Sequence, residues 1–217
     1  MDGVSTLEHG DRPGHCPGQL CARIFFTGYM MTCIERVRRK RAIQTAEGYL
    51  ELAMVFDDHW QLDLPLRKKL ADLVIACLSR IKKPQGHKPY ILFLKGQAAR
   101  TAERFKKAIS YLEQSLRLDS DNIHTLLALG WCYKRIHRTD LAIEAMEIAV
   151  EIDSDSAIAH YNLACYWSLA NRPRIAVLHL SNAISLNPDY RNLVATETDF
   201  DIIRDDVDFV ELTSVIV

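Results

Sequence analysis

Residues 123–156 read IHTLLALGWCYKRIHRTDLAIEAMEIAVEIDSDS, and their chemical pattern recurs 34 residues earlier and 34 residues later. Small residues hold the same three places in every copy: Gly96, Gly130 and Ala164; Ala108, Ala142 and Ala176; Ser115, Ala149 and Ala183. Large apolar residues keep the same period, at Leu112, Met146 and Leu180 and at Leu118, Ile152 and Leu186. A fixed period of this length indicates a stack of repeated helix pairs.

Polar turns separate the copies, at residues 119–122, 153–156 and 187–189. Their Asp, Asn and Ser side chains can accept hydrogen bonds from the unpaired N–H groups at the start of the next helix. Within each copy, the pattern predicts one helix over about the first fourteen residues, a short turn, and a second helix to about the thirtieth residue. The apolar period and the capping residues therefore agree on three repeats, at 89–122, 123–156 and 157–190.

The small residues at these places resemble the pattern of the tetratricopeptide repeat family, over about half of the chain. The resemblance implies an all-α fold, a right-handed α-solenoid of antiparallel helix pairs with a capping C-terminal segment. The chain departs from the family pattern at some positions. Lys95 stands where the family has leucine, and His160 stands where it favours a large apolar residue.

The flanking segments are predicted separately. In residues 33–88 we expect two helices that form a degenerate repeat, with a break at Asp57–His59 and with Pro65 in the first turn of the second helix. Residues 1–32 contain several Pro and Gly residues, so we expect an irregular segment, and Met30 or Met31 as the native start. Residues 191–217 alternate apolar and acidic residues and resemble the closing segment of bacterial tetratricopeptide arrays, so we expect an acidic amphipathic cap. A metal site made from its carboxylates is the alternative to a solvated acidic face.

Composition and charge argue against a secreted disulfide-rich protein and against a membrane-spanning one. The net charge is −1, but residues 1–41 hold seven Arg or Lys against four acids, and residues 189–217 hold two Arg against eight acids. This difference in charge between the two ends indicates either head-to-tail contact between copies of the chain or two ends that are simply exposed to solvent. The six cysteines show no spacing of a secreted disulfide scaffold, which favours a reducing, cytoplasmic setting. We expect no membrane span and no secretory signal.

The resemblance implies a concave groove lined by the first helix of each repeat. The groove residues that it predicts are Tyr90, Phe93, Leu94, Gln97, Arg100 and Thr101 from the first repeat, His124, Leu127, Ala128, Trp131, Lys134 and Arg135 from the second, and Ile158, Tyr161, Asn162, Cys165, Ser168 and Leu169 from the third. This set predicts an apolar, aromatic floor with a basic edge at Arg100, Lys134 and Arg135. An open patch of this kind marks an interaction site unless the capping tail, the N-terminal helices or a second copy of the chain fills it.

The predicted function is therefore protein–protein interaction: a scaffold, adaptor or chaperone-like module that binds a peptide or helix in the groove. The carboxylate clamp of cochaperone arrays has two Asn residues at position 6 of its first two repeats. Here Leu94 and Ala128 occupy that position, and only the third repeat has an asparagine, Asn162. We therefore expect no such clamp. Three-repeat chaperones of bacterial secretion systems share the expected architecture.

Other functions have weaker support in the sequence. The histidines form no zinc pair of the His-x-x-x-His kind, and no phosphate loop, nucleophile elbow or dinucleotide fingerprint occurs, so we expect no enzyme, no cofactor and no metal. His160 is expected to be a packed, hydrogen-bonded core residue. The alternative function is a nucleic-acid-associated regulator that uses the basic segment 36–41, but those charges spread around a predicted helix, so the favoured partner remains protein.

Overall fold

The computed structural model describes residues 18–54 and 62–214, which form helices and no strands. The chain divides into two units, Met1–Arg41 and Ala42–Val217. The elements are α1 (Gly18–Met54), α2 (Leu64–Ser79), η1 (Gln85–His87), α3 (Lys88–Thr101), α4 (Phe105–Leu116), α5 (Ile123–Arg135), α6 (Thr139–Ile152), α7 (Ala157–Leu169), α8 (Pro173–Leu186), α9 (Tyr190–Val194), η2 (Thr198–Ile203) and α10 (Val207–Ser214). Within the described ranges, no helix combines the length and the apolar character that crossing a membrane requires.

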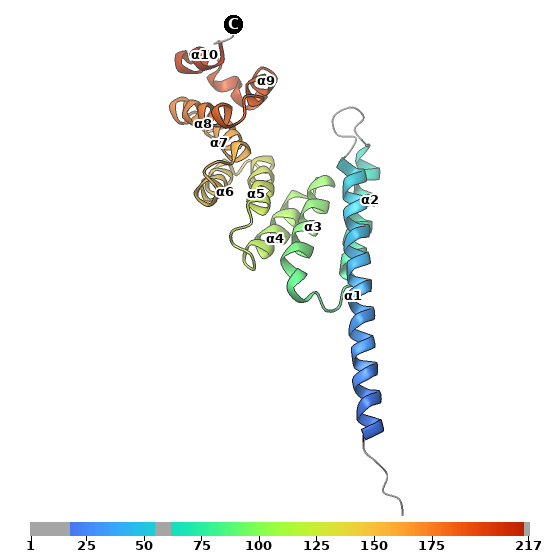
Figure 1. Ribbon diagram of the computed structural model, residues 1–217. Helices are drawn as coiled ribbons and strands as arrows, with labels where there is room; N and C mark the ends of the chain where they lie inside the picture. The colour runs from blue at the N-terminus through green and yellow to red at the C-terminus, as the bar shows by residue number, and fades with distance from the viewer. Residues whose placement is uncertain (1–17, 55–61, 215–217) are drawn as a thin grey trace, which may run out of the picture. The chain divides into compact units, whose positions relative to one another are not determined.

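The three predicted repeats are the helix pairs α3–α4, α5–α6 and α7–α8, which follow one another in chain order (Figure 1). Each pair packs most closely within itself and then against the next pair. The helices form here because each carries an apolar stripe that its partner covers; in α4, the buried side is made by Ala108, Ile109, Leu112 and Ser115. The all-α prediction is confirmed.

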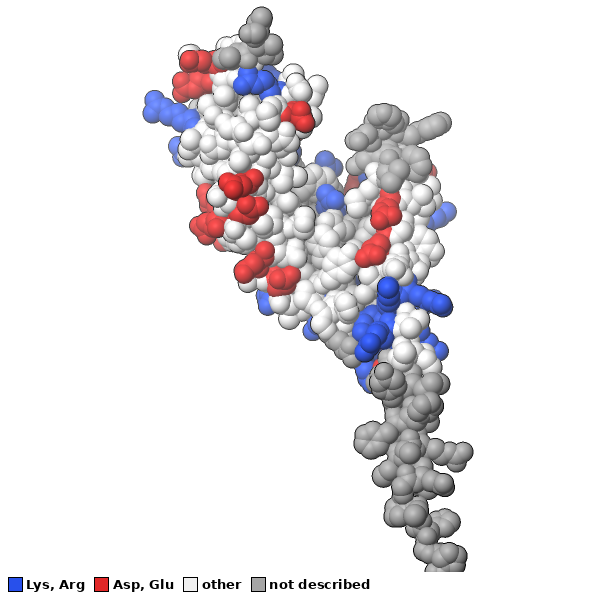
Figure 2. Space-filling view, in the orientation of Figure 1, with Lys and Arg blue, Asp and Glu red and all other residues white. Residues whose placement is uncertain are grey.

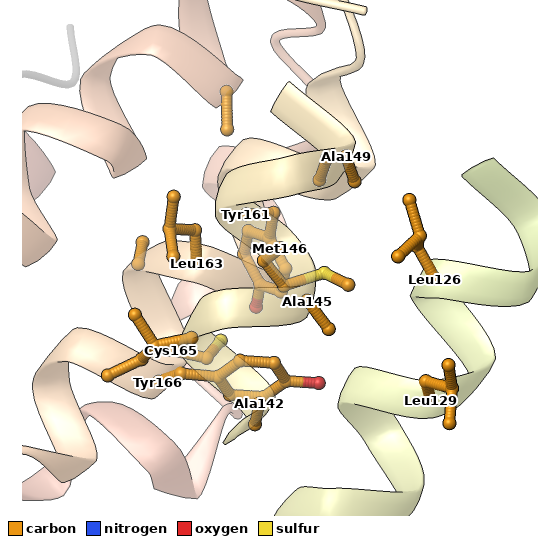
Figure 3. Close-up of a cluster of buried hydrophobic side chains, with 14 of the residues drawn as sticks. Leu126, Leu129, Ala142, Ala145, Met146, Ala149, Tyr161, Leu163, Cys165 and Tyr166 are labelled. Atoms are coloured by element: carbon orange, nitrogen blue, oxygen red, sulfur yellow. The ribbon is translucent and has the colours of Figure 1, made fainter. Parts of the chain in front are cut away.

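The small residues lie where the two helices of a repeat approach each other. Ala108, Ala142 and Ala176 have no exposed surface, and neither have Ala149 and Ala183. Figure 3 shows Ala142, Ala145 and Ala149 of α6 facing the larger side chains of neighbouring helices, among them Leu126 and Tyr166. The short side chains thus allow the close packing that the period predicts.

The first helix of each repeat ends in the same way. Glu103, His137 and Asn171 lie 34 residues apart and have φ values of 58°, 60° and 55°. The residue after each donates its N–H to a carbonyl five residues back: Arg104 to Ala99, Arg138 to Tyr133, and Arg172 to Trp167, at 2.9, 2.9 and 3.0 Å. This is the Schellman ending of a helix, which satisfies carbonyls that the helix itself leaves unpaired.

The N-terminal helices differ in part from the prediction. Helix α1 begins at Gly18, so the expectation of irregular structure up to residue 32 is wrong for residues 18–32. The Pro and Gly cluster ends at that glycine, and no proline follows it within the helix. The expected irregularity of residues 1–17 and the break at Asp57–His59 lie outside the described residues.

Helix α2 begins as predicted. Asp63 caps it by accepting a hydrogen bond from the Leu66 N–H at 3.1 Å, and Pro65 lies in its first turn. The second part of α1 packs with α2 and α3 around a core of Ile43, Leu50, Val74 and Leu78 with other apolar residues.

The C-terminal cap is α9, η2 and α10. Phe200, Ile203 and Phe209 turn into the core of the repeats, and Phe200 has no exposed surface. Asp201, Asp205 and Asp208 remain exposed. The apolar residues Val207 and Val210 are exposed as well, so the apolar stripe that the sequence predicts for the cap is only partly buried.

Candidate functional site

The predicted groove residues divide into an accessible set and a buried set. The residues that keep at least partial exposure are Tyr90, Phe93, Gln97, Arg100 and Thr101 of α3, His124, Leu127, Trp131, Lys134 and Arg135 of α5, and Ile158, Asn162 and Leu169 of α7. The buried residues are Leu94, Ala128, Tyr161, Cys165 and Ser168. A ligand on the surface of this structure can therefore contact only the first set.

Leu94 lies in the core, so its prediction as a groove residue is wrong. Its side chain is 4% exposed and packs with the apolar residues of α1 and α2. The family pattern predicts an open face at this position because it takes no account of the helices that precede the first repeat in this chain.

Tyr161, Cys165 and Ser168 are covered by the cap, which also removes them from the accessible groove. The ring of Tyr161 lies 4.7 Å from that of Tyr190 and 5.9 Å from that of Phe200, measured between centroids. The Ser168 hydroxyl donates a 2.8 Å hydrogen bond to the carbonyl of Asp199. The chain's own tail therefore covers Tyr161, Cys165 and Ser168 of the third repeat, whereas Ile158, Asn162 and Leu169 stay accessible.

Lys134 is joined to the cap as well. Its ammonium group forms an ion pair with the carboxylate of Asp199, a residue 65 positions later whose side chain is 9% exposed. Lys134 of the predicted basic edge is thus engaged by the cap.

Trp131 is the centre of the accessible part. Its ring lies 5.1 Å from the guanidinium carbon of Arg100 and 5.4 Å from that of Arg135. Arg135 also lies 5.2 Å from the ring of Phe105, which meets Trp131 edge to face at 5.6 Å. Cation–π contacts of this kind hold long arginine side chains in place while leaving their charge intact.

A pocket of about 330 Å³ opens beside Trp131. Its walls come from four helices and the turn after α3: Ala53, Met54, Arg67, Arg100, Thr101, Glu103, Trp131 and Arg135. Arg67 donates to the Thr101 carbonyl at 3.4 Å and to the Glu103 carboxylate at 3.1 Å. Three arginines and one acid are therefore among the described residues that line the pocket.

Tyr90 and Phe93 form a second aromatic surface on α3, with ring centroids 6.2 Å apart. The Tyr90 hydroxyl donates a 2.8 Å hydrogen bond to Glu47 of α1. Burial, followed by this hydrogen bond to a carboxylate, raises the pKa of Tyr90 to about 12. Tyr90 is therefore a neutral donor that ties α3 to α1, with 42% of its surface still exposed.

Two buried or half-buried histidines of the third repeat, His160 and His179, contact each other. His160 Nδ1 lies 3.0 Å from His179 Nδ1, and His160 Nε2 lies 3.1 Å from the Ser154 carbonyl oxygen, so His160 is the packed, hydrogen-bonded residue that the sequence predicts. Burial, and then the neighbouring His160, lowers the pKa of His179.

Cys165, Glu197 and Asp199 place ligand-type atoms within 4.8 Å of one another. However, Asp199 pairs with Lys134, and Glu197 accepts a 3.1 Å hydrogen bond from the Asp199 N–H. Burial, with the nearby Asp199 and Glu197, holds the pKa of the Cys165 thiol well above its usual value. Asp199 and Glu197 therefore serve to hold the cap in place, and the Cys165 thiol next to them is protonated.

The basic segment of α1 lies in the first unit. Arg36, Arg38, Lys40 and Arg41 are exposed, whereas Arg39 is only 9% exposed. Figure 2 shows basic side chains next to the grey part of this helix. The exposed charges come from adjacent positions of one helix and therefore point in different directions around it, as the sequence predicts.

Four pocket residues, Ala53, Met54, Arg67 and Glu103, are absent from the sequence-based prediction of the groove. The first three precede the repeats, so the 34-residue period carries no information about them. Glu103 occupies the turn between the two helices of the first repeat, where the family pattern assigns no ligand contact. Its equivalence to His137 and Asn171 is the one signal that could have drawn attention to it.

Comparison with known proteins supports the fold. Residues 99–164 match the tetratricopeptide repeat family. YrrB, described as a TPR protein with an unusual peptide-binding site, superposes with a TM-score of 0.54 at 16% identity, covering 81% of this chain and 87% of that chain. A crystal structure of the MamA protein superposes with a TM-score of 0.53 at 17% identity, covering 79% and 93% of the two chains. At these identities the likeness establishes the fold. The comparison with curated proteins gives no match.

Proposed function

The chain belongs to the tetratricopeptide repeat family through residues 99–164, and we propose that it is a protein-interaction module that binds a peptide or a helix beside Trp131. The observation that supports this most is the partly exposed Trp131 ring, held between Arg100 and Arg135 at the mouth of a pocket. Tryptophan and arginine are the residue types that contribute most to binding energy at protein interfaces.

The cap limits where the partner binds. Because Tyr161 and Cys165 are covered, the binding surface that we propose runs over α3 and α5, through Phe93, Leu127 and Trp131. Ile158 and Asn162 extend this surface onto α7, where they remain accessible. The role is one of a scaffold, an adaptor or a chaperone-like module, without catalysis.

We also propose a reducing, cytoplasmic setting for this role. Among the described cysteines, Cys132 and Cys165 are buried free thiols, Cys77 is partly exposed and Cys33 is exposed. Free thiols of these kinds persist where the environment keeps cysteine reduced.

The test is selection of peptides from a displayed library on the folded protein, followed by calorimetric measurement of affinity. Trp131→Ala should weaken the selected peptides by about 2 kcal/mol, or about thirtyfold in Kd. The matched control is Leu178→Ala on α8, because Leu178 is a large apolar residue with 58% exposure outside the proposed surface. Equal affinities for wild type and a folded Trp131→Ala variant would remove this surface from the proposal.

A further inference from the structure

We infer that copies of this chain bind one another head to tail. The head face is an exposed side of α1 formed by Ile34, Val37, Arg38 and Arg41, and the tail face is an exposed side of α10 formed by Val207, Asp208, Val210 and Glu211. Neither face belongs to the surface around Trp131, so this contact goes beyond the proposed binding of a peptide or a helix.

The tail face is apolar at a place where the end of a helical array is normally polar. The terminal element of a stacked array needs a polar outer side to stay soluble. Phe209 holds α10 from its buried side, with its ring centroid 5.4 Å from that of Phe200. On the opposite side of the helix, Val207 keeps 77% of its surface exposed, and Val210 is exposed one turn further along. Apolar side chains in this place indicate that another surface covers the cap.

The tail face is also acidic. Asp208 and Glu211 are exposed one turn apart on α10. Arg191 borders the same hollow as these two acids and offsets part of their charge. Residues 189–217 nevertheless hold eight acids against two arginines. A partner for this face should therefore combine apolar residues with positive charge.

The head face has this combination. Ile34 and Val37 are exposed apolar residues three positions apart on α1, and Arg38 and Arg41 lie on the same side of the helix. Among the described residues, neither of these two arginines takes part in an ion pair. Both charges are therefore available to a partner.

The two faces share one layout with opposite charge. In each, two apolar residues lie three positions apart and a charged residue directly follows the second, an arginine in α1 and a glutamate in α10. A second charge of the same sign lies within one turn of it on each helix. Packing one face on the other would bury the four apolar side chains together and place arginines against carboxylates.

A second copy fits the head face better than the other candidates do. A nucleic acid would pair its phosphates with the arginines but would offer nothing to the exposed Ile34 and Val37. Within one chain, residues 42–54 of α1 pack with α2 and α3, whereas α10 packs on α8 at the other end of the repeats. The contact is therefore assigned to two copies of the chain.

Sedimentation velocity of the full chain measures this association. The protein is studied over about a hundredfold range of concentration, at about 50 mM and about 500 mM NaCl, because salt screens contacts between exposed charges. The head variant carries Arg38→Glu and Arg41→Glu, and the tail variant carries Asp208→Lys and Glu211→Lys. All four positions are exposed, so the core is unchanged in both variants.

The matched controls are Arg174→Glu on α8 and Glu147→Lys on α6, which reverse exposed charges outside both faces. Val207→Ser removes an apolar side chain from the tail face without changing its charge. Circular dichroism checks that each variant is folded.

We expect wild type to associate as its concentration rises, and to do so more weakly at the higher salt. The head variant and the tail variant should each associate about tenfold more weakly or worse, because like charges then face each other. An equimolar mixture of the two should associate again, since one carries two acidic faces and the other two basic faces. Val207→Ser should weaken association at both salt concentrations, because salt does not screen an apolar contact. The two controls should behave as wild type does.

Several results would contradict the inference. A wild type that stays monomeric at every concentration would overturn it, and so would association that persists in both charge variants. Two folded variants that fail to associate when mixed would rule out the pairing of these two faces. Binding of a labelled single-stranded oligonucleotide that the head variant loses, in a chain that does not self-associate, would assign the head face to nucleic acid. None of these results affects the proposed peptide surface, which Trp131→Ala tests separately.

Discussion

Gly96 and Gly130 occupy equivalent places in neighbouring repeats, but the side chains above them differ in how easily they move. A Cβ atom at Gly96 would lie 2.6 Å from both Cγ and Cδ2 of Leu112, which is fully buried. A Cβ atom at Gly130 would lie 2.8 Å from Cε of Met146, the far end of a flexible side chain, and 3.3 Å from Cε2 of the buried Tyr166 ring, which would have to shift by only a few tenths of an ångström. The same added methyl group therefore meets a rigid obstacle in one repeat and a yielding one in the other.

We predict that Gly96→Ala lowers the free energy of unfolding by about 1–3 kcal/mol, because overpacking outweighs the gain in helix propensity of about 1 kcal/mol. Gly130→Ala should change stability much less. Urea denaturation of both variants measures the difference, with Gly48→Ala as the control, since nothing lies within 4 Å of a Cβ there. A loss at Gly130 equal to that at Gly96 would contradict this account.

The sequence predicts these small residues well because a periodic pattern records close helix contacts. It does not predict the ion pair between Lys134 and Asp199, whose partners are 65 residues apart and belong to different structural patterns. It also misplaces Leu94, because the helices that bury this residue lie before the repeats. Contacts between a repeat and a flanking element therefore cannot be predicted from the 34-residue period, because that period describes the repeats alone.

At the scale of the helix, the positive φ angles at Glu103, His137 and Asn171 show what a propensity-based prediction omits. Glycine is the usual residue at this place of a Schellman ending, and asparagine is tolerated. Glutamate and histidine there store backbone strain, which the three neighbouring hydrogen bonds of the ending compensate. The helix bounds follow from the 34-residue period, but the left-handed residue does not, because none of the three is a glycine.

His137→Gly should therefore raise the free energy of unfolding by about 1 kcal/mol, since relief of strain exceeds the added entropy of the unfolded chain. Asn171→Gly should give a smaller gain, because asparagine adopts this conformation at lower cost. The midpoint of urea unfolding reports both effects. His137 is exposed, so lost packing does not confuse the comparison, and a destabilised His137→Gly variant would refute the assignment of strain.

The pair α7–α8 has a built-in sensitivity to pH. The Ser154 carbonyl can only accept, so His160 Nε2 donates to it, and His160 Nδ1 then accepts from His179 Nδ1 when both rings are neutral. Burial lowers the pKa of His179 below its usual value near 6.5. Between the lowered pKa and the usual one, the unfolded chain binds more protons than the folded chain, so acidification destabilises the fold.

We predict that the melting temperature falls as the pH drops below about 6.5, and that His179→Gln reduces this fall. Thermal unfolding followed by circular dichroism across this pH range measures it. His124→Gln is the control, because His124 is an exposed histidine on α5. An unchanged slope in His179→Gln would assign the pH dependence to other groups.

For the molecule as a whole, the decisive feature is how the array of repeats is closed at its C-terminal end. A stacked array leaves the last repeat with one uncovered face, which requires a cap. Here α7 and α8 are covered by Phe200, Ile203 and Phe209. Lys134 pairs with the side chain of Asp199, and Ser168 donates a hydrogen bond to its backbone carbonyl. The sequence predicts the amphipathic cap and leaves a groove filled by the chain's own tail as an alternative, but it does not predict that the cap buries Tyr161 and Cys165 in particular.

Phe200→Ala should test this closure, because Phe200 has no exposed surface and its loss should cost about 3–5 kcal/mol. If the cap opens by itself, the Cys165 thiol becomes accessible while Cys132, buried between repeats, stays protected. Alkylation with iodoacetamide, mapped by mass spectrometry, should show faster modification of Cys165 than of Cys132 in the variant. Ile202→Ala is the control, since Ile202 belongs to the same segment and is 55% exposed. Equal acceleration at both cysteines would mean that the cap and the repeats unfold as one cooperative body, and that the covered part of the groove is never released separately.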